Sequence, residues 1–327
     1  MKAIVMKSPG GPDTLTLDQR DQPVATDGHV VVRVTAAGVN FIDTYQRSGL
    51  YPVATPYVPG FEGAGDVVEV GPGVTDVAVG DRVAWTGTPG SYAEYVAVPR
   101  TDVYAIPDGL DTTTAAALML QGLTAHYLCT SVYPLGPGDV ALVHAGAGGV
   151  GLLLTQLATA RGARVIATTS SADKAALARG AGASDVLRYD TFEHMSTDLP
   201  AAVRDLTDGE GVHVVYDGVG AATFDGSLAS LRTRGTMALF GGASGPVPPF
   251  DLQRLNKSGS LFITRPSMGH FLRTDDERAW RSGELFDAVL AGELNVRIGH
   301  TFGLHDAAQA HAALEGRQTT GKVLLQP

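Results

Sequence analysis

His144-Ala-Gly-Ala-Gly-Gly-Val-Gly151 is the stretch that decides the fold of this chain. It follows the short apolar run of residues 140–143 and leads into the apolar segment 152–160, so the predicted order is strand, glycine turn and helix. Within it stands a GxGxxG pattern, formed by Gly146, Gly148 and Gly151, with Gly149 and Val150 between the last two glycines. In this context the pattern predicts dinucleotide binding.

Each glycine of the pattern has a physical reason. One allows a tight turn, one lets the backbone approach a pyrophosphate, and one lets the helix pack on the strand. The helix that follows directs its N-terminal N–H groups and partial positive charge toward the phosphates. We therefore expect the phosphates of a dinucleotide at the start of a helix at residue 149.

The segments around the turn alternate between strand and helix. After the turn signal Pro107-Asp108-Gly109, residues 112–114 offer a threonine N-cap before an apolar run at 115–120. Alternation of this kind predicts a doubly wound parallel sheet. The expected strands are 140–144, 164–168, 212–217, 236–240 and 262–264, and helices are expected from 149, from 172 and near 224.

The flanking parts of the chain have a different character. Up to about residue 98, short alternating runs at 29–34, 63–70 and 82–85 are separated by turn residues, which predicts a compact β-rich domain. The tail adds helices around 277–290 and 305–314 and a strand at 322–325, and is too short to fold alone. The fold class is thus α/β, with a Rossmann doubly wound parallel sheet domain at 123–265 and a β-rich domain formed by 1–122 and 266–327.

Composition excludes several classes of function. The formal net charge is −10 and no basic run occurs, which argues against a nucleic-acid partner. The single cysteine, Cys129, lies among apolar neighbours, so we expect a buried inert thiol and no disulfide. No apolar stretch reaches membrane-spanning length and the first residues lead straight into a strand, so we expect a cytoplasmic protein without membrane contact.

The second strand of the predicted sheet indicates which cofactor is bound. NAD-specific sites place an Asp or Glu at the end of this strand, but here the strand ends Thr168-Thr169-Ser170-Ser171. Hydroxyl groups such as that of Ser170, together with Lys174 and Tyr189, can bind a 2′-phosphate. The alternative is that Lys174 only solvates a helix surface. Taken with the missing acid, these residues favour NADPH.

Motifs in the same order occur along nearly the whole chain, and they resemble those of the zinc-free medium-chain quinone oxidoreductases, the family that includes zeta-crystallin. The matching pieces are Gly38-Val-Asn-Phe-Ile-Asp-Thr-Tyr45, Arg47-Ser-Gly-Leu-Tyr51, Pro59-Gly-Phe-Glu-Gly-Ala-Gly65, Gly80-Asp-Arg-Val83, Gly122-Leu-Thr124, His144 to Gly151, Val215-Tyr-Asp-Gly-Val-Gly220, Thr264-Arg-Pro-Ser267 and Gly321-Lys322.

The resemblance implies a GroES-like β-rich catalytic domain and a reaction without metal. In the zinc alcohol dehydrogenases of the wider superfamily, Cys and His bind the catalytic zinc. Here Asn40 stands about where the first cysteine ligand would be, Phe61 replaces the histidine, and the cysteine-rich lobe is absent. The resemblance also implies a homodimer formed through the cofactor domain, with edge pairing near residues 261–264.

By resemblance, the site residues fall into four groups. They are Asn40, Asp43, Tyr45 and Tyr51 around the nicotinamide; Thr124, Gly148, Gly149 and Val150 along the nicotinamide and pyrophosphate; Ser170, Lys174 and Tyr189 at the adenosine phosphate; and Phe240, Gly241, Thr264, Arg265 and Arg317 on the far side. Rim packing is the alternative for the two tyrosines, and a plain turn residue is the alternative for Asn40. Gly241-Gly242 and Gln121 depart from the pattern of relatives, and both departures concern substrate preference.

The predicted activity is hydride or electron transfer from NADPH to a quinone. Asn40, Tyr45 and Tyr51 would orient the acceptor by hydrogen bonds, and either a tyrosine or solvent would supply the proton. Two alternatives stay open: a reductase of enones or enoyl compounds such as alkenals, and a non-catalytic NADPH-binding protein.

Overall fold

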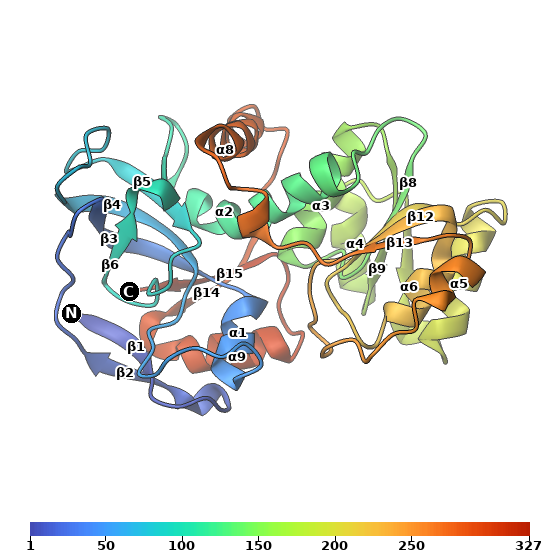
Figure 1. The fold of residues 1–327 in the computed structure, drawn as a ribbon, viewed down its shortest axis with the longest axis horizontal. Coiled ribbons are helices and arrows are strands. Elements are labelled where there is room, and N and C mark those ends of the chain that lie inside the picture. Colours follow the sequence, from blue (N-terminus) through green and yellow to red (C-terminus); the bar gives the residue numbers. More distant parts are fainter. The chain divides into compact units, whose positions relative to one another are not determined.

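The computed structural model describes all 327 residues, and the chain folds into two compact units. Unit 1 consists of residues 1–123 and 274–327, and unit 2 of residues 124–273. Figure 1 colours unit 2 from green to orange, and unit 1 in the blue and red ends of the sequence.

The core of unit 2 is a six-stranded sheet in which every neighbouring pair is parallel. Because all six strands are parallel, their carboxyl ends lie at one edge of the sheet, and the strand order runs outward from the centre in both directions. The predicted doubly wound parallel sheet is confirmed. In spatial order its strands are β10 (Asp185–Arg188), β9 (Arg164–Thr169), β8 (Val140–Val143), β11 (Val212–Asp217), β12 (Leu231–Leu239) and β13 (Phe262–Thr264).

Helices connect these strands and cover the sheet. Apolar side chains of β8, β9, β11 and β12 pack with those of the helices into a buried cluster that includes Leu142, Ile166 and Val215. The expected helices starting at Gly149 and Ala172 and near Phe224 are all present. The helices of unit 2 are α3 (Gly149–Ala160), α4 (Ala172–Gly180), α5 (Met195–Leu206), α6 (Phe224–Ser230) and α7 (Gln253–Lys257).

The two ends of unit 2 meet in a ring stack. Tyr127 and Phe271 lie with ring centroids 4.6 Å apart and planes 3° from parallel. Residues 266–273 therefore fold with unit 2, whereas the sequence expectation placed them in the catalytic domain. The ring stack is one contact that holds this segment to unit 2, and no local pattern around Phe271 reveals it.

Unit 1 is built on a seven-stranded sheet that contains the tail of the chain. The last strand pairs in parallel with β14 and antiparallel with β3, so the tail completes the sheet begun by the first part of the chain. The order is β14 (Ile298–Gly303), β15 (Lys322–Gln326), β3 (His29–Val39), β4 (Glu62–Val70), β5 (Arg82–Thr86) and β7 (Val103–Ala105), with β6 (Tyr95–Pro99) on β3; β1 (Lys2–Met6) and β2 (Leu15–Gln19) form a hairpin of their own.

Four helices accompany the sheets of unit 1: α1 (Phe41–Ser48), α8 (Asp275–Leu290), α9 (Ala307–Glu315) and the first part of α2 (Thr112–Tyr127). The expected threonine cap of α2 is replaced by an aspartate. The Asp111 carboxylate accepts the Thr114 backbone N–H at 2.9 Å, so the helix includes the threonines. Strand β3 extends five residues beyond the expected end because residues 36–39 pair with β4 and β15 despite their broken alternation.

Two smaller expectations can be checked here. Cys129 forms no disulfide, and its thiol is buried, as predicted. None of the helices is both long and apolar enough to cross a bilayer.

Candidate active site

The glycine turn after β8 has a backbone different from the one expected. Gly146, Gly148 and Gly151 all have ordinary negative or extended φ angles, and the left-handed residue of the turn is Ala145, with φ of 51°. The tight turn is therefore made by Ala145. Left-handed backbone at alanine is strained, which fits a segment held in place by its surroundings.

The glycines are required because other atoms approach them closely. A Cβ on Gly146 would lie 2.8 Å from Ala167 Cβ on β9, and a Cβ on Gly151 would lie 2.9 Å from Gly146 Cα and still nearer to Ala145 O. Gly148 is the N-cap of α3 and is partly exposed, as are Gly149 and Val150. The first N–H groups of α3 therefore lie at the carboxyl edge of the sheet, where an anion can bind them.

Gly151→Ala is expected to weaken NADPH binding by about tenfold or more, because the new methyl group collides with the backbone of the turn and shifts the N–H groups of α3. Fluorescence titration with NADPH measures the effect. Gly180→Ala in α4 is the matched control, since its Cβ would meet no atom within 4 Å. Equal affinities for the two variants would contradict this role of Gly151.

A buried histidine holds the base of the glycine turn. His144 Nδ1 lies 2.9 Å from Thr168 Oγ1 and Nε2 lies 2.9 Å from Ser227 Oγ. The Ser227 hydroxyl donates to Asp217 Oδ2 at 2.7 Å, so its oxygen accepts from His144 Nε2–H, and Thr168 donates to Nδ1. Burial lowers the pKa of His144, which keeps the ring neutral. The ends of β8, β9 and β11 are joined through this one ring.

Asp217, the last residue of β11, completes the same network. Its Oδ2 also accepts the Thr223 hydroxyl at 2.7 Å, and its Oδ1 accepts the N–H groups of Val219 and Gly220 at 2.8 and 3.0 Å. The carboxylate is fully buried and receives four hydrogen bonds. It thereby fixes the loop after β11 at the carboxyl edge of the sheet.

The end of β9 fits a phosphorylated ribose. Strand β9 ends at Thr169 and is followed by Ser170 and Ser171, without a carboxylate. Ser171 is the N-cap of α4, where its hydroxyl accepts the Lys174 backbone N–H, so Ser170 and Lys174 flank a helix N-terminus. Ser170, Lys174 and Tyr189 are each partly exposed. Hydroxyl, ammonium and helix N–H groups together form a set of donors suited to a 2′-phosphate.

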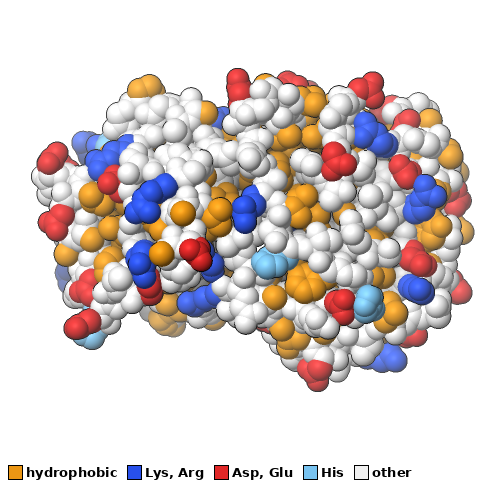
Figure 2. All heavy atoms as spheres, turned by 180° about the vertical axis from the view of Figure 1, so that it is seen from behind, with side chains coloured by type: hydrophobic (Ala, Val, Ile, Leu, Met, Phe, Trp, Pro, Cys, Tyr) orange, Lys and Arg blue, Asp and Glu red, His pale blue; other side chains and the backbone are white.

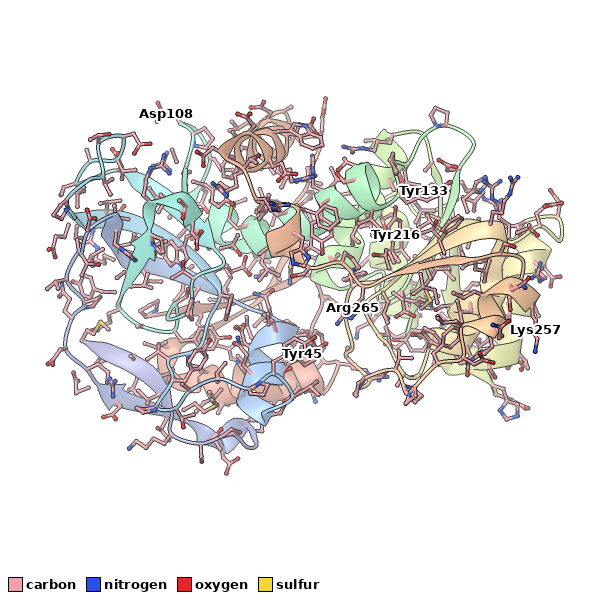
Figure 3. The ribbon with its side chains drawn as sticks, in the orientation of Figure 1. Tyr45, Asp108, Tyr133, Tyr216, Lys257 and Arg265 are labelled. Atoms are coloured by element: carbon pink, nitrogen blue, oxygen red, sulfur yellow. The ribbon has the colours of Figure 1, made fainter.

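The remaining predicted residues of unit 2 follow its outer strands. Phe240 N and Gly241 N both donate to Asp217 O, at 2.9 and 3.3 Å, so these residues lie beside the end of β11. Thr264 ends β13, and Arg265 donates to Leu239 O at 2.9 Å. Figure 3 labels Arg265 beyond β13. The structure thus collects the glycine turn, Ser170, Phe240, Gly241, Thr264 and Arg265 at one edge of the sheet; Thr124 lies in α2 and is buried.

Helix α1 of unit 1 positions the two predicted tyrosines. The helix ends at Gly49, which is left-handed with φ of 85°, and the chain turns back so that Tyr51 N donates to Tyr45 O at 3.0 Å. The two rings meet edge to face with centroids 5.3 Å apart. Tyr45 is half-buried and Tyr51 is 40% exposed, so unit 1 presents a paired aromatic surface with two hydroxyl groups (Tyr45 is labelled in Figure 3).

Asp43 lies on the same helix but is fully buried in a network of its own. Its Oδ2 accepts the Asn40 N–H at 2.8 Å and the Tyr92 hydroxyl at 3.1 Å, and Tyr92 Oη lies 3.1 Å from His311 Nε2. Asp43 Oδ1 and His311 Nδ1 have no hydrogen-bond partner. Burial raises the pKa of Asp43 to about 7 against the opposing hydrogen bonds from Asn40 and Tyr92. Burial, with Arg47 nearby, lowers the pKa of His311 to about 3.

Asn40 contacts two charged residues that the sequence did not single out. Its Nδ2 donates to Glu62 Oε1 at 2.6 Å, and Lys322 Nζ donates to its Oδ1 at 2.9 Å. Lys322 and Glu62 also form a direct ion pair, and all three side chains are buried. Glu62 and Lys322 both lie in motifs that resemble those of the family. A lysine at the head of the apolar strand Lys-Val-Leu-Leu was the signal for a buried cation.

Arg317 follows α9 in unit 1 and is exposed. Two residues earlier, Glu315 receives a hydrogen bond of 2.5 Å from Arg47 on α1. Arg317 therefore lies at the end of α9 that is tied to α1.

The charged side chains form no cluster suited to a metal ion. No group of three or more His, Cys, Asp or Glu side chains could hold a metal ion. On the face drawn in Figure 2, Lys and Arg side chains are interspersed with Asp and Glu.

Comparison with known proteins gives matches over both units. The family "Alcohol dehydrogenase GroES-like domain" matches residues 26–108, and the family "Zinc-binding dehydrogenase" matches residues 149–280. A quinone oxidoreductase of Pseudomonas aeruginosa is 43% identical over 330 residues, covering 100% of this chain and 99% of that protein. A 2-haloacrylate reductase of a Burkholderia species is 42% identical over 335 residues, with the same coverage. Among solved structures, a mycobacterial protein in complex with NADPH is 51% identical, with a TM-score of 0.97 and full coverage of both chains.

Proposed function

We propose that this chain is an NADPH-dependent oxidoreductase that reduces quinones. The chain belongs to the quinone oxidoreductase family of the medium-chain dehydrogenases and reductases. The resemblance found in the motifs extends over the whole chain. The observation that carries the cofactor is the carboxyl edge of the sheet in unit 2, where a glycine turn at a helix N-terminus lies beside a strand end with hydroxyl groups, Lys174 and no acid.

When bound, NADPH supplies a hydride, and with one proton it converts a quinone into a hydroquinone. The N–H groups of α3 bind the pyrophosphate, and Ser170, Lys174 and Tyr189 bind the 2′-phosphate. Thr124, Phe240, Gly241, Thr264, Arg265 and Arg317 complete the cofactor contacts. The hydroxyl groups of Tyr45 and Tyr51 and the side-chain amide of Asn40 orient the acceptor oxygen, and one of the tyrosines or a solvent molecule delivers the proton. No metal takes part in this proposal.

Lys174→Ala is expected to raise the Kd for NADPH by about tenfold and to leave the Kd for NADH unchanged, because the ammonium group would bind the 2′-phosphate, which NADH lacks. Both affinities can be measured by fluorescence titration. Lys257→Ala is the control, since Lys257 is an exposed lysine of the same unit on α7 (Figure 3). A parallel loss for both cofactors would contradict the assignment.

Tyr45→Phe with Tyr51→Phe is expected to lower kcat by about a hundredfold while the Kd for NADPH changes less than about twofold, because the hydroxyl groups hold the acceptor. Steady-state rates and NADPH titrations provide the two numbers. Tyr95→Phe on β6 of the same unit serves as the control. Equal losses of turnover and NADPH affinity would refute the acceptor role.

The activity itself is tested by the loss of NADPH absorbance with an ortho-quinone, with NADH in a parallel cuvette. Rapid oxidation of NADPH alone supports the proposal. The similarity to a 2-haloacrylate reductase favours a second candidate, reduction of a conjugated carbonyl compound, so an alkenal and a haloacrylate are assayed beside the quinone. Faster turnover of either would assign the chain to that reaction. Tight NADPH binding without turnover of any acceptor would leave a non-catalytic NADPH-binding protein.

We also propose a homodimer formed by the cofactor-binding unit. Strand β13 is the edge of the six-stranded sheet, and Phe262 on it is 60% exposed, so a second β13 could pair there. Light scattering after size-exclusion chromatography, with Phe262→Lys as the interface variant, tests the proposal; a monomeric wild type would refute it. The cytoplasmic location remains a prediction, which cell fractionation would check.

A further inference from the structure

We propose that Lys322 is a positioning residue that, with Glu62, fixes a single orientation of the Asn40 side-chain amide. The consequence for catalysis rests on the proposed function, since Asn40 is there one of the groups that orient the acceptor. The contacts that carry the inference all lie within unit 1.

The amide of Asn40 lies between groups of opposite charge. Its Nδ2 donates to Glu62 Oε1 at 2.6 Å, and its Oδ1 accepts from Lys322 Nζ at 2.9 Å and from Gln121 Nε2 at 3.4 Å. Asn40 is 5% exposed, Glu62 0% and Lys322 1%. The amide therefore has a charged protein partner at each end.

These charges permit only one orientation of the amide. Rotation of the amide group by 180° would place its oxygen against the Glu62 carboxylate and its NH₂ group against the Lys322 ammonium, so both contacts would become repulsive. The ammonium also polarises the amide through its oxygen, which makes the Nδ2 hydrogens stronger donors. With one hydrogen on Glu62, the second Nδ2 hydrogen is left as the donor that Asn40 can offer to an acceptor oxygen.

The fold builds this arrangement from distant parts of the chain. Gly38 on β3 leaves the space for the Glu62 carboxylate, since a Cβ there would collide with Oε1. Glu62 Oε2 accepts the Leu120 backbone N–H of α2 at 2.8 Å, which fixes the carboxylate. Lys322 is the first residue of β15. A buried ion pair contributes little to stability compared with apolar side chains of similar size. Stability therefore does not explain the Lys322–Glu62 pair, whereas control of the Asn40 orientation does.

The sequence makes a direct test practical, because the chain contains only three asparagines, Asn40, Asn256 and Asn295. The last two are exposed and serve as internal references. In full-length protein labelled with side-chain ¹⁵N asparagine, Asn40→Asp removes and thereby assigns one pair of NH₂ signals. We expect the Asn40 pair to exchange with solvent at least about a hundredfold more slowly than the other two pairs, because it is buried and hydrogen-bonded.

In Lys322→Met, the Asn40 signals are expected to shift and to lose about tenfold or more of their protection from exchange. Because loss of one partner of a buried pair can unfold the protein, Glu62→Gln with Lys322→Met is the second variant, in which both charges are removed. The glutamine amide introduced in place of the Glu62 carboxylate can accept or donate, so the double variant permits both orientations of the Asn40 amide, and the Asn40 signals should again lose protection. Leu325→Ala, on the core face of the same strand, controls for general destabilisation.

Kinetics then connect the orientation to the reaction. The double variant should lose about tenfold or more in kcat with the quinone, while the Kd for NADPH stays within about twofold, and Leu325→Ala should retain kcat. Unchanged Asn40 signals in the folded double variant would overturn the proposal. If the wild type reduces quinones, a double variant with the same kcat as the wild type would overturn it as well. If the wild type reduces no quinone, the proposed function fails, but the NMR measurement still decides whether Lys322 positions Asn40.

Discussion

Asp217→Ala is expected to lower the free energy of unfolding by about 3 to 5 kcal/mol and to abolish measurable NADPH binding at micromolar concentrations. The substitution removes a fully buried carboxylate and leaves the hydroxyl groups of Thr223 and Ser227 and the N–H groups of Val219 and Gly220 without their acceptor. Hydrogen bonds to a charged group are the stronger ones, and buried donors left unpaired are costly. The loop after β11 then loses its fixed position beside the glycine turn.

Urea unfolding followed by circular dichroism measures the loss, and hydrogen exchange in peptides of β8 and β11 locates it. Asp225→Ala is the matched control, because Asp225 is 59% exposed at its side chain and pairs with Arg254 on the surface. Such a pair contributes about 0 to 1 kcal/mol. If the two variants were equally stable, the hydrogen bonds of Asp217 would contribute nothing measurable to the free energy of unfolding.

Asp43→Asn and His311→Gln are expected to change the pH dependence of the free energy of unfolding in opposite directions. In the wild type, this pair of residues should make the free energy of unfolding of unit 1 depend little on pH between about pH 4.5 and 6. In that range the folded state holds one proton on Asp43, whose pKa is about 7, and none on His311, whose pKa is about 3. The unfolded state holds its proton on the histidine instead, because the ordinary pKa values are 3.8 and 6.5. The number of bound protons is thus nearly equal in both states.

Each substitution removes one half of this balance. With Asp43→Asn, only the depressed pKa of His311 remains, so stability falls as the pH falls from 6.5 toward 3, by about 1.4 kcal/mol per pH unit. With His311→Gln, only the raised pKa of Asp43 remains, so stability is greatest below pH 3.8 and is lost as the pH rises toward 7, with the same slope.

Tryptophan fluorescence is the suitable probe, because both tryptophans, Trp85 and Trp280, belong to unit 1 and Trp85 is fully buried. Urea midpoints between pH 4 and 7 give the slopes. His305→Gln, which removes an exposed histidine of unit 1, should leave the wild-type profile unchanged. Slopes of the same sign in Asp43→Asn and His311→Gln would show that the two groups are not the balancing pair.

The fold could be predicted because its signals are local. The strand, glycine turn and helix at residues 140–160 lie within one stretch of chain, and the alternation that follows repeats at a regular spacing. Within the turn, local reasoning assigned the tight turn to a glycine, and the structure corrects this assignment. The left-handed position belongs to Ala145, and Gly146 is required by Ala167, a residue of the next strand.

The family resemblance nominates Asn40, Tyr45 and Tyr51 as site residues from one short segment, and their roles stay a prediction. It does not reveal the buried partners that contact Asn40. Lys322 is 282 positions from Asn40, and they meet only because β15 joins the sheet beside β3. Likewise, the environment of Asp43 depends on Tyr92 and His311, which are distant in sequence.

The stack of Tyr127 on Phe271 bears on the order in which the molecule assembles. Unit 1 is split by the whole of residues 124–273, so its two pieces must find each other across a long intervening chain. If unit 2 folds first, the stack brings its ends together and the intervening chain acts as a short loop. Each tenfold reduction in effective loop length saves about 2 kcal/mol of closure entropy. Folding of unit 2 during synthesis would then shorten the effective chain between strands β3 and β15, which pair in unit 1.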